Sequence, residues 1–81
     1  MALSERDRES MRMANGVLTE WINRPDDFSA QEAVGRYEQP DAAVMVLTGL
    51  IQIAGTVVKL LAAQKGVQPE NILQGIAKGL A

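Results

Sequence analysis

The chain has 81 residues, with 8 Lys and Arg against 10 Asp and Glu and a net charge of −2. This length predicts a single domain over residues 1–81 and excludes a catalytic core with a separate cofactor domain. Cysteine and histidine are both absent from the sequence, which excludes disulfides, thiol nucleophiles, the common zinc sites and an imidazole proton shuttle. The slightly acidic balance argues against a general nucleic-acid binder. Because 47% of the residues are hydrophobic, we expect a folded chain.

Residues 4–24 are predicted to form the first of four helices. Ser4 is a suitable N-cap, and acidic residues follow it in the first turn, where the helix dipole favours them. Pro25 ends the helix, because the residue before a proline is displaced from helical geometry. Gly16 in the helix interior costs about 1 kcal/mol relative to alanine, and no feature of the sequence explains it. The apolar side chains that share one arc of about 140° are Met11, Ala14, Val17, Leu18, Trp21 and Ile22.

A short second helix is predicted over residues 30–38. Ser29 and Glu32 have the spacing of a capping box, in which each side chain accepts a hydrogen bond from the other residue's backbone N–H. The turn before this helix contains Phe28, which is expected to anchor the turn to the core. Pro40 ends the segment, because proline does not continue a helix.

Residues 41–65 are predicted to form the longest helix. Asp41 is the expected N-cap, and Gly66 the expected C-cap, since glycine accepts positive φ without a steric clash. On a helical wheel the polar side chains fall within about 80°, and the large apolar ones occupy about 200°. The polar stripe consists of Thr48, Gln52, Thr56 and Lys59. This ordered pattern predicts a buried helix in a soluble, cytoplasmic protein.

The first alternative is a single-pass membrane protein that spans the bilayer with residues 42–63. These residues contain one charge and have the length of a transmembrane helix. A lysine at the centre of a bilayer costs at least about 2.5–3.5 kcal/mol, and an ordered polar stripe serves no purpose against lipid. The flanking charges indicate no orientation, because basic residues lie on both sides. We therefore expect no membrane partner.

Residues 69–80 are predicted to form the last helix, with Pro69 at its favoured first position. Together with the end of the preceding helix, residues 57–80 have the rhythm of a helix-turn-helix motif, which makes DNA binding the second alternative. The last helix carries a single basic residue, Lys78, whereas phosphate contacts need several. We therefore expect no nucleic acid as a partner.

The fold class that follows from these segments is all-α. No stretch shows the two-residue alternation of a strand. The prediction is a small bundle built around one long apolar helix. Its four segments run over about 4–24, 30–38, 41–65 and 69–80.

Few residues could carry enzyme chemistry. Asp26 and Asp27 are the only adjacent carboxylates, and a turn after proline explains them, since the further oxygens of a calcium loop are missing. Lys59 lies on the polar stripe, where its ammonium group reaches water. The sequence has no nucleophile elbow, phosphate-binding loop or dinucleotide fingerprint. We predict that the protein is not an enzyme and has no catalytic residues, metal or cofactor.

The long helix carries more apolar surface than the other helices can cover. One neighbouring helix covers about 100–140°, against about 200° of apolar surface on this helix. A large exposed apolar patch marks an interface, which a symmetric homodimer closes most simply. A foreign protein is the alternative occupant, and a compact monomer would require the long helix to bend. The predicted self-association seam passes through Val46, Leu50, Ile53, Val57 and Leu60.

The aromatic residues are the other candidates for contacts with a partner, because aromatic side chains often anchor interfaces. They are Trp21, Phe28 and Tyr37. The predicted function is that of a small non-enzymatic protein-interaction module whose main partner is itself.

The sequence LLAAQKGVQPENIL over residues 60–73, in a chain with 11 alanines and 5 Arg against 3 Lys, supports a resemblance. It resembles the ends of many short uncharacterised proteins of high-GC actinobacteria and their phages. The similarity covers the C-terminal half of the chain. The resemblance implies an accessory role in which the protein docks on a host protein, and it assigns no functional residue.

Overall fold

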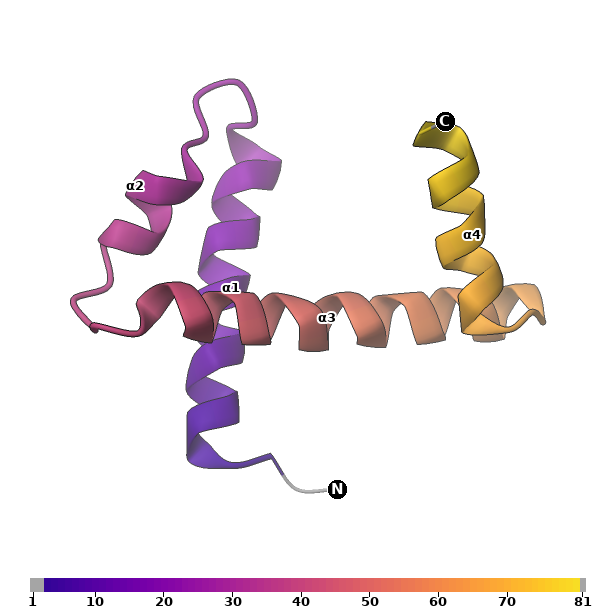
Figure 1. Ribbon diagram of the computed structural model, residues 1–81, viewed down its shortest axis with the longest axis horizontal. Coiled ribbons are helices and arrows are strands. Elements are labelled where there is room, and N and C mark those ends of the chain that lie inside the picture. Colours follow the sequence, from indigo (N-terminus) through magenta and orange to yellow (C-terminus); the bar gives the residue numbers. More distant parts are fainter. Residues whose placement is uncertain (1–2, 81) are drawn as a thin grey trace.

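A computed structural model describes residues 3–80, and its fold is all-α, as the sequence predicts (Figure 1). The helices of the described residues are α1 (Glu5–Asn23), α2 (Ala30–Gly35), α3 (Ala42–Lys65) and α4 (Pro69–Leu80). They form a small bundle in which α3 contacts each of the other three helices, whereas α4 packs against α3 alone. α1 crosses the first half of α3, and α4 rises from its far end. The resulting shape is open, with extents of 41 × 36 × 20 Å.

The predicted start of α1 is confirmed. The Ser4 hydroxyl accepts a hydrogen bond from the backbone N–H of Asp7 at 3.0 Å, and the Asp7 carboxylate accepts one from the Ser4 N–H at 3.4 Å. This capping box satisfies two backbone donors that a helix start otherwise leaves free. The pKa of Asp7 lies below its ordinary value because these hydrogen bonds stabilise the carboxylate.

The second helix is shorter than predicted, because α2 ends at Gly35. The Ser29 hydroxyl accepts the Glu32 N–H at 3.3 Å, which is the half of the predicted capping box that the structure shows. Beyond the helix, Tyr37 turns towards α1, and its hydroxyl donates to the carbonyl of Met13 at 3.3 Å. The chain leaves helical geometry here because Tyr37 covers α1.

The predicted role of Asp41 is wrong in one respect. Asp41 occupies the N-cap position of α3, but its side chain makes no capping hydrogen bond. Its carboxylate instead pairs with Arg6 of α1, which lowers the pKa of Asp41. The predicted C-cap is confirmed, since Gly66 adopts a φ of 68°.

The core lies where α1 and α3 cross. A Cβ atom on Gly49 would lie 2.6 Å from the carbonyl carbon of Ser10 and 2.7 Å from the Cβ of Ala14. Glycine is therefore needed for the two helices to pack backbone against backbone. Around this contact the core consists of Met13, Val17, Ala33, Ala42, Met45 and Val46, with Phe28, Val34, Tyr37 and Leu50 partly buried against it.

The buried face of α1 differs from the predicted face. The buried residues of α1 are Ser10, Met13, Ala14 and Val17. The predicted face included Trp21 and Ile22, which are both exposed because α3 crosses α1 too far from its C-terminal end to cover them. Gly16 now has an explanation, since a Cβ atom there would lie 2.8 Å from the Tyr37 hydroxyl oxygen.

Candidate interaction surface

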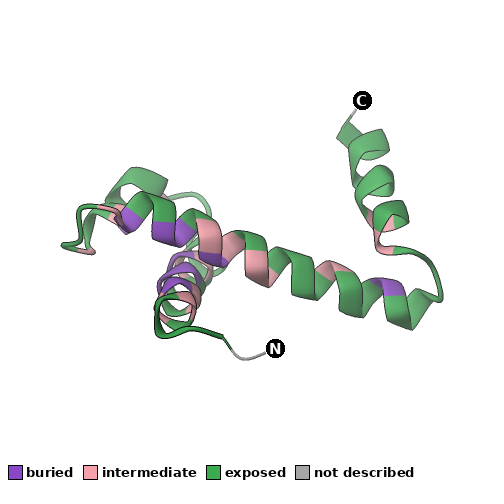
Figure 2. Ribbon diagram, turned by 60° about the horizontal axis from the view of Figure 1, so that its bottom comes forward, coloured by how far each residue is buried: buried purple, intermediate pink, exposed green. Residues whose placement is uncertain are grey.

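The second half of α3 is largely uncovered. The first half buries Ala42, Met45, Val46 and Gly49, whereas the second half buries only Ala62 among the described residues. Figure 2 shows this contrast, with purple concentrated near the α1 crossing and mostly green over the rest of α3 and over α4. The prediction of a buried helix therefore holds for the first half alone, and the apolar surface expected to lack a covering helix lies in this half, since α4 projects away from α3 instead of lying along it (Figure 1).

The exposed area of the chain is large for its mass. The chain exposes 6253 Å². A folded monomer of 8.8 kDa is expected to expose about 4,800 Å². The radius of gyration is 14.5 Å, against about 12 Å for a compact domain of this length. The excess of about 1,500 Å² exceeds the roughly 800 Å² that each partner buries in a standard interface.

An apolar groove runs across the uncovered half of α3. Its first part lies between α3 and α1 and has a volume of about 330 Å³. Its second part lies between α3 and α4, has a volume of about 360 Å³ and shares Ala54 and Val58 with the first. Because the two depressions share these lining residues, we call them together the α3 groove. It is lined mainly by Leu18 of α1, by Leu50, Ile53, Ala54, Val57 and Val58 of α3, and by Leu73 of α4.

Three of the five predicted seam residues line the α3 groove, namely Leu50, Ile53 and Val57. Val57 is 56% exposed, and Leu60 is 61% exposed. Val46 is only 3% exposed, so its assignment to an open strip is wrong. The wheel alone placed Val46 in the apolar arc, but it packs in the core because α1 crosses at the adjacent Gly49.

The three aromatic residues divide into two groups. Phe28 and Tyr37 pack against the core and support the α1–α2 region. Trp21 near the end of α1 is 50% exposed and remains a candidate for contacts with a partner. Sequence reasoning did not identify Leu18 and Leu73 as lining one groove, because only the helix arrangement brings them to opposite ends of it.

Part of the predicted polar stripe faces α1 rather than solvent. Thr48 and Gln52 are half-buried, and the Gln52 side-chain oxygen is buried without a hydrogen-bond donor among the described residues. Thr56 and Lys59 are exposed, as the wheel predicts. Small and polar residues lie at the crossing because two closely packed helices require small side chains there, whether or not these are polar. Met45 and Val46 share the core with α1, whereas Ile51, Val57 and Leu60 are more than half exposed.

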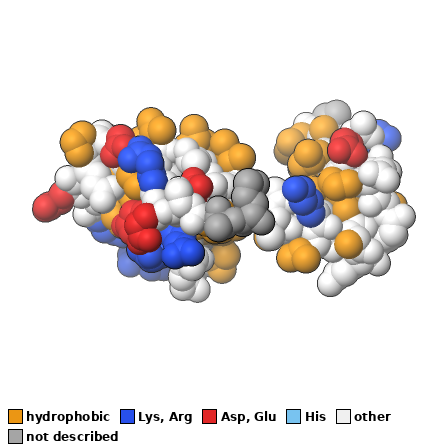
Figure 3. Space-filling view, turned by 90° about the horizontal axis from the view of Figure 1, so that it is seen from below, with side chains coloured by type: hydrophobic (Ala, Val, Ile, Leu, Met, Phe, Trp, Pro, Cys, Tyr) orange, Lys and Arg blue, Asp and Glu red, His pale blue; other side chains and the backbone are white. Residues whose placement is uncertain are grey.

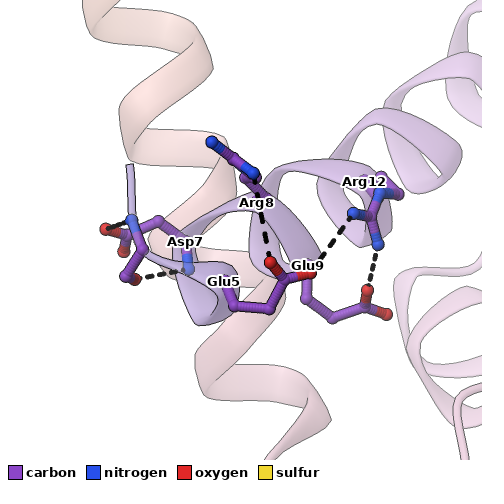
Figure 4. Close-up of polar contacts among 6 residues, drawn as sticks. Glu5, Asp7, Arg8, Glu9 and Arg12 are labelled. Atoms are coloured by element: carbon purple, nitrogen blue, oxygen red, sulfur yellow. Dashed lines mark hydrogen bonds and ion pairs between the residues drawn. The ribbon is translucent and has the colours of Figure 1, made fainter. Parts of the chain in front are cut away.

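Charged side chains gather on α1, where Arg8 and Arg12 line a pocket that adjoins the α3 groove at Ile53. Seen from below, they cover the part of the molecule where α1 lies and are sparse where α3 ends (Figure 3). Arg12 pairs with Glu9, and its guanidinium also lies 3.9 Å from Glu5, which is 4.0 Å from Arg8 (Figure 4). These pairs are exposed, so their expected contribution to stability is small.

A second ion pair joins α1 to the segment after α2. Arg36 donates to the Glu20 carboxylate, which lowers the pKa of Glu20 and raises that of Arg36. Both this pair and the Arg6–Asp41 pair lie at the surface and join α1 to other segments of the chain. They link α1 to the segment after α2, and no residue of either pair lines the α3 groove.

Two chemical features of the described residues bear on other functions. No group of three or more acidic side chains is placed to hold a metal ion in residues 3–80. α3 is long and apolar enough to cross a membrane, and only 17% of its most apolar window is buried. Length and apolar character alone do not separate a membrane span from an interface helix.

No protein-family model, curated protein or solved structure matches this chain. The resemblance to actinobacterial and phage proteins and the cytoplasmic location therefore stay predictions. The same holds for DNA binding by residues 57–80.

Proposed function

We propose that this protein is a small non-enzymatic interaction module that self-associates through the uncovered half of α3. The observation that carries the proposal is the excess of about 1,500 Å² of exposed surface over a compact monomer of the same mass. Much of that surface is apolar, since Ile51, Val57 and Leu60 are each more than half exposed. Removing such surface from water is the main favourable term in protein association.

The groove favours a protein partner over chemistry on a small substrate. Its lining offers one cation, Lys59, and otherwise aliphatic and small side chains. Orientation of a reacting substrate requires several converging polar groups. An apolar helix face requires none, because apolar burial is not directional.

The experiment that tests self-association is a mass measurement in aqueous buffer without detergent. Light scattering and sedimentation over a range of concentrations should give about twice the 8.8 kDa of one chain. A mass of one chain at every concentration would contradict the proposal.

A single-pass membrane role for residues 42–63 is the second candidate. It is favoured by the length and apolar character of α3 and by its small buried fraction. Thr48 and Thr56 direct their hydroxyls back to the carbonyls of Val44 and Gln52 at 2.9 and 2.8 Å, which suits either environment. Flotation with phosphatidylcholine vesicles distinguishes the two, because a spanning protein floats with lipid while a soluble dimer stays in the aqueous fraction.

A further inference from the structure

We infer that the α3 groove of one chain binds α4 of a second copy. The two chains are related by a two-fold axis, so each α4 lies in the groove of the other chain. The inference rests on the proposed self-association and names the segments that meet. It is carried by the width of the groove, by the unpartnered face of α4 and by the reciprocity of the two surfaces.

The groove has the width of one helix. α1 crosses α3 at Gly49, and the turn into α4 folds back over Ala62, whose carbonyl accepts the Val67 N–H at 3.0 Å. These two points are about 20 Å apart along α3 at a rise of 1.5 Å per residue, and at 100° per residue they lie about 140° apart around it. α1 and α4 therefore flank the apolar strip of Leu50, Ile53 and Val57 from opposite sides. Packed helices lie about 8–10 Å apart, so the roughly 20 Å along α3 accommodates one further helix on this strip.

α4 has a face suited to this groove, and its own chain covers that face only at its edge, where Leu73 meets α3. Leu73, Ile76 and Leu80 recur at helical spacing, and each is more than half exposed. The opposite face carries the polar residues Gln74 and Lys78. An amphipathic helix of this kind binds by laying its apolar face in a hydrophobic groove.

The lengths of the facing segments also agree. α4 spans about 18 Å. The part of α1 beyond the crossing, residues 14–23, spans about 15 Å and presents Leu18 and the exposed Ile22. A partner's α4 can therefore contact α1 along most of its length while its tip reaches the α3 floor at Ile53 and Val57.

A second copy accounts for the exposed surface better than a foreign helix does. Each chain supplies one unpartnered α4 and one groove, so a two-fold axis closes both contacts at once. A single foreign helix would fill the groove and cover Leu73 at its edge, but it would leave Ile76 and Leu80 of α4 in water. The excess area of about 1,500 Å² per chain exceeds the roughly 800 Å² per partner of a standard interface, which allows two such contacts.

The test places one charge on each side of the proposed contact. Ile76→Lys alters α4, and Val57→Glu alters the groove floor. Both positions are more than half exposed in the single chain, so neither change disturbs its core. We expect each variant alone to raise the dimer dissociation constant by about 30-fold or more, the level of an interface hot spot. Helix content measured by circular dichroism confirms that each chain still folds.

Matched controls add the same charges beside the contact. Gln74→Lys lies on the polar face of α4, and Thr56→Glu lies next to Val57 on the exposed part of the polar stripe. We expect both controls to dimerise as the wild type does. Mixing the Ile76→Lys and Val57→Glu chains should restore a heterodimer, because the altered α4 then meets the altered groove and the second contact is wild type.

The outcomes separate this inference from the proposed function. If Val57→Glu dissociates the dimer while Ile76→Lys leaves it unchanged, the dimer exists but α4 is not its occupant, and the inference fails alone. If the wild-type chain is a monomer at every concentration, the proposed function fails as well. If the wild-type chain instead floats with phosphatidylcholine vesicles, α3 belongs to lipid and both are overturned.

Discussion

The two halves of α3 are both apolar, yet one is packed and the other is open. The first half buries four residues, of which Ala42, Met45 and Val46 belong to the main core. The second half buries only Ala62 among the described residues. The difference arises from Gly49, which lets the α1 backbone approach closely, so that the residues on either side are covered. Burial in this chain therefore follows from where another helix can approach, and not from hydrophobicity alone.

The largest expected effect comes from removing a core side chain at the crossing. Met13→Ala should lower the free energy of unfolding by about 2–5 kcal/mol, because Met13 is fully buried and its loss leaves a cavity. Urea denaturation at fixed protein concentration measures this. Leu47→Ala is the control, since Leu47 is exposed on α3, and we expect a change within about 0.5 kcal/mol. Equal losses for both variants would mean that the packed region is not the centre of stability.

Two glycines of α3 test the same comparison, because replacement by alanine should destabilise the protein at one of them and stabilise it at the other. Gly49→Ala should lower the free energy of unfolding by about 1–3 kcal/mol, because the added methyl group meets the Ser10 backbone. Gly55→Ala should raise it by about 0.5–1 kcal/mol, because nothing lies within 4 Å and alanine favours the helix. Thermal unfolding monitored by circular dichroism measures both. A stabilising Gly49→Ala would refute the close crossing.

The sequence was sufficient to predict the helices but not their contacts. Caps at Ser4 and Gly66 and the proline at position 69 locate helix ends through local chemistry, and the structure confirms them. The assignment of Val46 to an open strip failed because a wheel describes one helix and not its neighbour's position. Nothing in the sequence marks Gly49 as the contact point, because its missing Cβ matters only where α1 crosses. Leu18 and Leu73 could not be joined in one groove without the crossing geometry.

The next prediction concerns Gly16, which supports the packed region from the α2 side. Gly16→Ala should lower the free energy of unfolding by about 1 kcal/mol, since its methyl group displaces the Tyr37 hydroxyl from the Met13 carbonyl. Adding Tyr37→Phe should recover part of this loss, because the crowding oxygen is removed and alanine is the better helix former. A double-mutant cycle by urea denaturation measures the coupling. Independent effects would mean that the two residues do not touch.

The smallest effect is expected from the ion pair that braces the packed region. The pKa of Glu20 is lowered by the hydrogen bond from Arg36 and lies below its value in the unfolded chain. Its contribution to stability is therefore complete above the unfolded pKa and is lost as the pH falls through the lower folded pKa. Glu20→Gln should weaken the protein slightly at neutral pH and reduce the loss of stability between about pH 5 and pH 3, where carboxyl groups titrate. Arg36→Gln in the Glu20→Gln background should change neither the stability nor its pH profile further. A further loss of stability in that double variant would show that Arg36 stabilises α1 through a contact other than its ion pair with Glu20.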